Sequence, residues 1–217
     1  MELLLVHLTD IHIRDDDDLD VLSTRTDSIG GAICNHITNP DETEVVFCVT
    51  GDLAFSGKDD QYTAAGLILD EIYSLINKRY PKVGIHSVFV PGNHDCNFDA
   101  PEEEVREPLL ISPILDISKP SVLKACTTIQ KNFYAFGEEW DKKHGAMFCD
   151  DDKILTVNEL NFDSYGIHLK YHCINTSWCS KKHEEKGKMK ITTGKMSMVT
   201  DFLEKKSDDI VITMMHH

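Results

Sequence analysis

Three short polar segments of this chain carry the aspartate, histidine and asparagine side chains that bind metal ions in proteins. They are Leu8-Thr9-Asp10-Ile11-His12, Gly51-Asp52 and Gly92-Asn93-His94-Asp95. Each segment follows a short apolar run that predicts a β-strand. A lone Asp-x-His would be weak evidence, but three ligand-bearing strand ends in order are hard to produce by chance. We therefore predict one metal site built from all three segments.

The spacing of these residues indicates which ions they can bind. Asp10 and His12 lie two positions apart at a predicted strand end, so their side chains face the same side and can reach one ion. A carboxylate with an imidazole suits zinc, iron or manganese better than calcium. Asp52 has two carboxylate oxygens and can bridge two cations about 3.5–4 Å apart. Asn93 offers a neutral oxygen to a second ion, and His216, at the end of the chain's last predicted strand, offers a second nitrogen.

Two further residues of the third segment predict catalytic roles. His94 follows Asn93 directly and should point elsewhere. A histidine in this place can protonate a leaving oxygen or stabilise the charge that builds on it. Asp95 could orient the His94 imidazole, as a carboxylate orients a catalytic histidine.

These residues also have structural interpretations. An isolated histidine is usually a structural or surface residue, and Asp10, Asp52 and Asn93 could instead cap helices or turns. Because His12 and His94 each end a predicted strand within a motif of the right kind, we favour the metal site.

The first half of the chain is predicted to alternate strands and helices. Apolar runs at residues 3–8, 45–49 and 86–90 predict strands, and helical spacing of apolar residues predicts helices over 19–37 and 59–78. This order favours a parallel sheet with right-handed crossovers. Open α/β sheets bind their ligands at the carboxyl ends of the strands, where the three polar segments lie.

The second half is predicted to differ. Residues 97–120 are rich in Pro, Glu and Asp, and we expect an irregular insertion over the active-site face. A helix is predicted over 122–140, and its Phe133, Phe136 and Trp140 are interpreted as core rather than as a base-stacking platform. Short strands follow that are expected to be antiparallel, with turns at Asn158 and Ser164-Tyr165-Gly166, then a helix and a last strand. The ranges are 146–148, 154–157, 161–162 and 167–175 for the short strands, 194–204 for the helix and 210–214 for the last strand.

Composition limits the classes of function. The chain has 217 residues and a net charge of −15, with 22 Lys and Arg against 37 Asp and Glu, so it lacks a general electrostatic footprint for nucleic acid. It has no apolar run of membrane-spanning length and no signal peptide, so we expect a cytoplasmic protein without a membrane partner. The seven cysteines show no zinc-ribbon or redox spacing and are expected to be free thiols.

A lysine-rich segment lies between residues 181 and 190. Its lysines could attract a phosphorylated substrate, but a solvated loop is the favoured interpretation. They are Lys181, Lys182, Lys186, Lys188 and Lys190.

Taken together, the motifs resemble the calcineurin-like metallophosphoesterase superfamily over essentially the whole chain. Leu8-Thr9-Asp10-Ile11-His12 and Val90-Pro91-Gly92-Asn93-His94-Asp95 are close to the usual wording of that family, and Ile174-Asn175-Thr176-Ser177 and His216-His217 also fit it. The resemblance implies an α/β fold, a four-layer sandwich of two mixed β-sheets flanked by helices. It also implies two divalent metal ions, Mn, Fe or Zn.

The resemblance further implies a role for each matching residue. Asp10, His12 and Asp52 would bind the first ion, and Asp52, Asn93 and His216 the second. A metal-bridging hydroxide would attack phosphorus in line. His94 would assist the leaving group.

One element of the family is absent from the sequence. No Gly-His-x-His occurs in it, although such an element completes both metal shells in the family. We therefore expect residues 1–217 to form a metallophosphoesterase domain that lacks its C-terminal part, with further domains after residue 217. With this thin ligand set, weak metal occupancy and poor activity are expected.

Three functions remain open at this stage. The first is a phosphohydrolase, preferably a phosphodiesterase acting on a small phosphoester such as a nucleotide. The second is a metal-dependent nuclease whose nucleic-acid track comes from other domains. The third is a phosphate- or nucleotide-sensing regulatory module of a larger multidomain protein.

Overall fold

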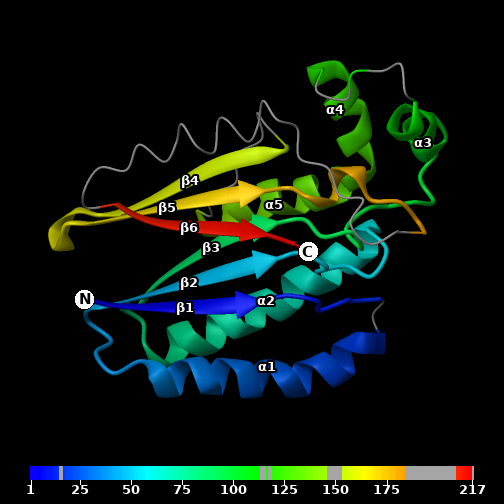
Figure 1. Ribbon diagram of the computed structural model, residues 1–217. Helices are drawn as coiled ribbons and strands as arrows, with labels where there is room; N and C mark the ends of the chain where they lie inside the picture. The colour runs from blue at the N-terminus through cyan, green and yellow to red at the C-terminus, as the bar shows by residue number, and fades with distance from the viewer. Residues whose placement is uncertain (15–16, 113–115, 117–118, 146–152, 184–208, 217) are drawn as a thin grey trace.

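The chain folds into a layer of helices and two stacked β-sheets, as Figure 1 shows. The computed structural model describes all residues except 15–16, 113–115, 117–118, 146–152, 184–208 and 217. Helices α1 and α2 cover one face of the first sheet, and the second sheet covers its other face. None of the helices in the described part is long and apolar enough to cross a membrane.

The first sheet has three parallel strands in the order β1 (Glu2–Leu8), β2 (Thr43–Thr50) and β3 (Gly84–Val90). Helices α1 (Asp17–His36) and α2 (Asp59–Arg79) connect these strands, so the predicted βαβαβ order is confirmed. Leu8 is paired with Val49, and Thr50 with Val90, so the three strands end level with one another. This register brings the three polar segments to one edge of the sheet.

The helix layer is held by apolar side chains from alternate positions of the strands. Val45, Phe47 and Val49 of β2 are buried on the side of α1, α2 and α5 (Lys131–His144). Phe133, Phe136 and Trp140 of α5 are buried in this same cluster, which confirms their interpretation as core. Tyr134 of the same helix is buried with them.

The second sheet contains β4 (Leu155–Phe162), β5 (Ile167–Ile174) and β6 (Asp209–Met215). β4 and β5 are antiparallel, and β5 and β6 are parallel. Val46 and Cys48 of β2 pack against Tyr171 and Cys173 of β5 between the two sheets. The second sheet is therefore mixed, as the resemblance implied, whereas all the described pairs of the first sheet are parallel.

Three predictions about the second half were wrong in detail. The stretch over residues 97–120 is not irregular throughout, because residues Glu103–Ile111 form helix α3. The helix predicted over 122–140 is interrupted, with α4 (Pro120–Thr127) and α5 separated by the 3₁₀ turn η1 (Thr128–Gln130).

Asn158 was predicted to be a turn and instead lies inside the continuous strand β4. Its buried amide donates a hydrogen bond to the Cys173 sulfur at 3.4 Å, which satisfies a polar group within the sheet. The turn predicted at residues 164–166 is confirmed by the 3₁₀ turn η2 (Asp163–Tyr165) and the left-handed Gly166.

Some predictions fall where the structure gives no description. The strand predicted over 146–148 and the helix predicted over 194–204 lie outside the described residues. The six cysteines of the described part are all free, as expected.

Candidate metal centre

The three polar segments meet in an unusual backbone conformation. Asp10, His12 and Asp52 have φ angles of 55°, 54° and 54°, in the left-handed region that residues other than glycine rarely adopt. Backbone hydrogen bonds hold this conformation, since the N–H of Asp10 donates to the Gly51 carbonyl and that of His12 to the Asp52 carbonyl. Such strain of about 1–3 kcal/mol a residue is typical of functional sites, where surrounding structure enforces it.

Asp52 lies at the centre of the site. Its side chain is buried, and its Oδ1 accepts the backbone N–H of His94 at 2.8 Å. Its Oδ2 lies 3.3 Å from Nε2 of His216 and 3.7 Å from Nε2 of His12. One carboxylate therefore lies between two histidines that come from different strand ends, as a bridging ligand must.

Two groups of candidate ligand atoms share Asp52. His12, Asp52 and His94 form one group, and Asp10, Asp52 and His216 form the other, with the ligand atoms of each group within 4.8 Å of one another. The structure thus brings the predicted ligands together around Asp52. Asp10 groups with His216 and also lies near His12, with Oδ1 3.8 Å from the Nε2 of that ring, and His94 lies with His12.

His216 is held by hydrogen bonds that fix its orientation. Its Nδ1 lies 2.7 Å from the carbonyl oxygen of Thr50 and donates to it, which turns Nε2 towards the oxygen atoms of the site. Nε2 faces Oδ1 of Asn93 at 3.2 Å as well as Asp52. A ring with one nitrogen bonded to a carbonyl and the other aimed at oxygen ligands has the arrangement of a metal-binding histidine.

His94 is oriented in a similar way by a backbone carbonyl. Its Nδ1 donates to the carbonyl oxygen of Phe55 at 2.7 Å, and its ring lies against the Phe55 ring with centroids 5.3 Å apart. The His12 ring packs edge-on against His94, with centroids 4.5 Å apart. The Nε2 atom of His94 is therefore free of the Phe55 carbonyl and available to a substrate.

The role expected for Asp95 was wrong. Its carboxylate is fully buried and accepts the backbone N–H groups of Gly92, Asp52 and Ala54 at 2.8, 2.9 and 3.1 Å. It also accepts the Tyr62 hydroxyl at 2.8 Å. Its bonds tie the ends of β2 and β3 together, and the Phe55 carbonyl, not this carboxylate, orients the His94 ring.

Burial raises the pKa of Asp95 to about 6, although the hydrogen bonds from Gly92, Ala54 and Tyr62 act to lower it. The same burial raises the pKa of Tyr62, and the charge of Asp95 raises it further. Asp95 is therefore ionised at neutral pH and Tyr62 remains a hydrogen-bond donor.

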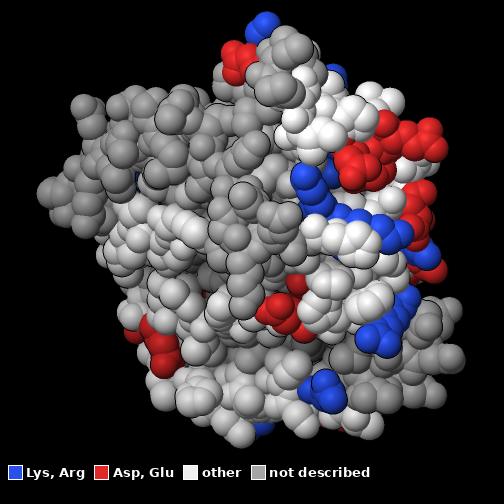
Figure 2. All heavy atoms as spheres, turned by 45° about the vertical axis from the view of Figure 1, so that its right-hand side comes forward, with Lys and Arg blue, Asp and Glu red and all other residues white. Residues whose placement is uncertain are grey.

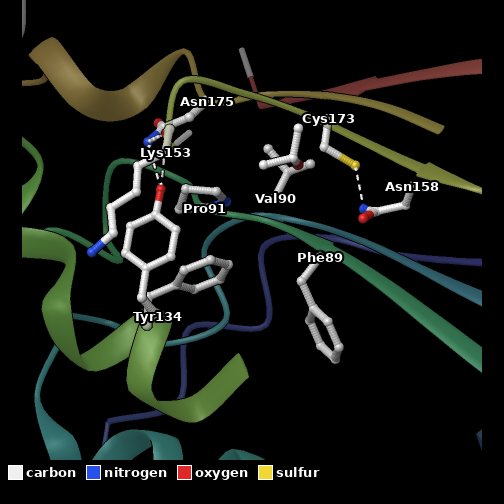
Figure 3. A pocket seen from close by; sticks show the side chains of 10 residues that line it. Phe89, Val90, Pro91, Tyr134, Lys153, Asn158, Cys173 and Asn175 are labelled. Atoms are coloured by element: carbon white, nitrogen blue, oxygen red, sulfur yellow. Dashed lines mark hydrogen bonds between the residues drawn. The ribbon is translucent and has the colours of Figure 1, made fainter. Parts of the chain in front are cut away.

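The segment after β5 supports the site from outside. The Thr176 hydroxyl donates to the His216 carbonyl, and the Ser177 hydroxyl donates to the Pro91 carbonyl at 3.3 Å. The Asn175 amide points away from the ligands and donates to the Tyr134 hydroxyl at 3.0 Å, as Figure 3 shows. This segment therefore fixes the motif loops without contributing a ligand.

The donor set suits divalent metal ions. Carboxylate, imidazole and amide groups converge from the ends of β1, β2, β3 and β6, with the shared carboxylate of Asp52 in the middle. In the described part of the chain, the buried Nδ1 of His12 has no hydrogen-bond partner, while its Nε2 faces the carboxylates of Asp10 and Asp52. An imidazole beside two carboxylates is a ligand set that suits manganese, iron or zinc.

Ligands at the carboxyl ends of parallel strands, between two stacked sheets, define an α/β metalloprotein. The family described as calcineurin-like phosphoesterase matches residues 3–217, and this chain belongs to that family. Membership implies metal-dependent hydrolysis of a phosphoester. No curated protein matches the chain.

Metal binding is expected to release a proton from His216. Burial lowers the pKa of His216, but the Asp52 carboxylate and the Thr50 carbonyl more than reverse this, and the pKa lies above its ordinary value. For Asp52, burial raises the pKa, but bonds from His216 and the N–H of His94 bring it below its ordinary value. Below this raised pKa the metal-free site holds an imidazolium–carboxylate pair, and a ligating imidazole must be neutral.

The affinity for Mn²⁺ should therefore fall about tenfold for each pH unit below the raised pKa of His216. The pair itself stabilises the metal-free fold below pH about 6.5, and that contribution is lost as pH rises through the raised pKa. Calorimetric titration with Mn²⁺ in two buffers of different ionisation enthalpy measures the protons released. His216→Gln should release fewer protons than the wild type, and equal release would contradict this assignment.

Proposed function

We propose that this chain hydrolyses phosphodiesters of small molecules such as nucleotides. Two divalent ions would be held by Asp10, His12, Asp52, Asn93 and His216. Such ions supply Lewis acidity, which activates water and neutralises the charge on phosphate oxygens. The observation that carries the proposal is that Asp52 belongs to both groups of candidate ligands.

His94 is the proposed proton donor to the leaving oxygen. Its Nδ1 is occupied by the Phe55 carbonyl, so its Nε2 is the atom that faces a substrate. The ring is fixed further by its contacts with His12 and Phe55, which lower the entropy lost on binding. A histidine held in this way contributes typically about 10²–10⁴-fold to a proton-transfer step.

The experiment compares two diesters whose leaving groups differ in basicity, with Mn²⁺ present. Bis(p-nitrophenyl) phosphate releases a stable phenolate, whereas diphenyl phosphate releases a more basic one that needs a proton. His94→Gln is expected to lower kcat about 10²-fold or more on diphenyl phosphate and much less on the nitrophenyl ester. Mn²⁺ affinity is measured alongside, because His94 also lies in one ligand group.

His36→Gln is the matched control, since this exposed histidine ends α1 away from the site. It should leave both rates unchanged. An equal loss of rate on the two esters would remove the proton-donor role. Failure of the protein to hydrolyse any diester, with Mn²⁺ bound, would overturn the proposed function itself.

A further inference from the structure

A hollow of about 280 Å³ opens beside the proposed proton donor. Asn93 and His94 form its inner wall, so it is continuous with the metal centre. Two aromatic and two basic residues form much of the rest of the hollow's lining. These are Phe55, Phe98, Lys181 and Lys182.

The aromatic walls offer an apolar surface next to the reacting group. Phe55 is 36% exposed, although its ring lies against His94, and Phe98 is partly buried. Arg106 lies over the Phe98 ring, with its guanidinium carbon 6.0 Å from the centroid. Exposed aromatic rings beside a catalytic group can contact a flat or apolar leaving group, and a nucleobase can stack on such a ring.

The lysines bring positive charge to a chain whose net charge is −15. Nζ of Lys182 lies 3.0 Å from Oδ1 of Asp99, but both side chains are more than 60% exposed, so a phosphate can displace this weak pair. In the described part of the chain, Lys181 has no acidic partner. Figure 2 shows basic side chains on the face that carries the strand ends, beside a group of acidic ones.

The backbone that carries these lysines is held by a buried arginine. Arg106 of α3 donates from Nη2 to the carbonyls of Trp178 and Ser180 at 2.8 and 2.6 Å, and from Nε to that of Cys126 at 2.8 Å. Ser180 directly precedes Lys181, so these bonds fix the backbone from which the side chains of Lys181 and Lys182 extend. The site is therefore built by the fold and does not rest on two surface lysines alone.

Of the acidic side chains of α3 near the lysines, Glu103 is paired with Arg106 and Glu107 lines a different hollow. The guanidinium of Arg106 binds the carboxylate of Glu103 at 2.9 Å. Glu107 lines a second hollow, which Lys181 and Lys182 also line. It does not line the hollow beside His94. Among the described residues, Asp99 is thus the one carboxylate of the hollow's lining, against two ammonium groups.

We propose that this hollow binds a leaving group that carries a second phosphate. Phe55 and Phe98 would contact its apolar or base moiety, and Lys181 and Lys182 would bind the phosphate. The inference rests on the proposed function, since it assumes that the metal centre takes the scissile diester. It narrows the substrate to phosphodiesters with an additional phosphate group, such as a phosphorylated dinucleotide.

The test uses a dinucleotide with and without a terminal phosphate, which have the same scissile bond. Binding is measured by calorimetry on the protein in EDTA, and kcat/KM is measured separately with Mn²⁺. The wild type is expected to prefer the phosphorylated dinucleotide about tenfold in both measurements, and less at high salt. Joint replacement Lys181→Gln and Lys182→Gln should remove the preference by lowering the affinity and the kcat/KM for the phosphorylated dinucleotide to those of the unphosphorylated one.

Two further variants separate charge from packing. Lys181→Arg with Lys182→Arg should keep the preference for the phosphorylated dinucleotide. Phe98→Leu should weaken the binding of both dinucleotides by the same factor. Lys78→Gln with Lys82→Gln removes the same charge from the opposite end of the first sheet and is the matched control. All these lysines are exposed, so the fold should persist.

The outcomes of the two measurements are distinguishable. A binding preference that the lysine variant abolishes, without turnover of either dinucleotide, would sustain this subsite and refute the proposed diester hydrolysis. Turnover of both dinucleotides with no preference, or a preference that survives the double glutamine variant, would overturn the subsite and leave the hydrolysis standing.

Discussion

Replacing Gly92 with alanine is expected to abolish metal binding and hydrolysis. A Cβ atom at this position would lie 2.1 Å from Oδ1 of Asp52 and 2.4 Å from its backbone nitrogen. Neither atom can give way, because the N–H of Asp52 donates to Asp95 and Oδ1 accepts from His94. The added methyl must therefore displace the central carboxylate of the site or the strand end that carries it.

Mn²⁺ titration and thermal unfolding measure this effect. We expect no measurable Mn²⁺ binding and a loss of about 3 kcal/mol in the free energy of unfolding, the upper range for overpacking. Gly31→Ala is the matched control, because nothing lies within 4 Å of its added methyl and the residue is inside α1. It should bind Mn²⁺ normally and gain about 0.5–1 kcal/mol in stability. Normal Mn²⁺ binding by the Gly92 variant would contradict this expectation, because it would show that the loops after β2 and β3 can move apart to make room for the added methyl group.

The first half of the fold could be predicted because its patterns are local. The apolar run that became β2 is bounded by polar residues, and the stripe along α2 repeats at helical spacing, so each element is encoded in its own segment. Parallel pairing then follows from the connections, and it places the strand ends side by side. The candidate ligand residues could be predicted for the same reason, since each lies directly after a strand.

The roles of neighbouring residues could not be predicted in this way. Asp95 adjoins His94 in sequence, which suggested that it orients the ring. Its carboxylate instead turns inward, where three backbone N–H groups and Tyr62 surround it. Tyr62 belongs to α2, and this contact depends on how the helix packs. The carbonyls of Phe55 and Thr50, which orient the two histidines, are backbone groups that any residue provides, so no sequence signal marks them.

The misreading of Asn158 has a related physical cause. Asparagine is common in turns, and it was interpreted as one between two short apolar runs. In the structure the two runs form one strand, because the amide finds a sulfur acceptor on the neighbouring strand. A buried polar side chain inside a sheet is tolerated only with such a partner, and the partner is distant in sequence.

The left-handed conformations of Asp10, His12 and Asp52 explain why the site needs so much support. Glycine would adopt these angles without strain, but it offers no ligand atom. The fold therefore holds strained residues in place with backbone bonds between strand ends and with the buried carboxylate of Asp95. Support of this kind fixes the ligands before an ion binds, which lowers the entropy lost on binding.

Asp95→Asn is accordingly expected to destabilise the whole fold and not only to slow catalysis. The carboxylate accepts two N–H groups on Oδ2 and the Ala54 N–H with the Tyr62 hydroxyl on Oδ1. An asparagine amide must place its NH₂ against one of these pairs. The Tyr62 hydroxyl can rotate and accept, but the Ala54 N–H then faces another donor. We expect a loss of about 3 kcal/mol in the free energy of unfolding, since hydrogen bonds to a buried charge are worth about 1.5–3 kcal/mol each.

Chemical denaturation at pH 7, with and without Mn²⁺, tests this expectation. Tyr62→Phe removes one of the four donors and should cost about 1.5 kcal/mol. Asp41→Asn makes the same chemical change at an exposed carboxylate paired with Lys82, and should stay within about 0.5 kcal/mol of the wild type. If Asp95→Asn kept full stability and Mn²⁺ affinity but lost kcat, the orienting role towards His94 would have to be restored. Loss of stability together with metal affinity would instead identify Asp95 as the residue that joins the two motif loops.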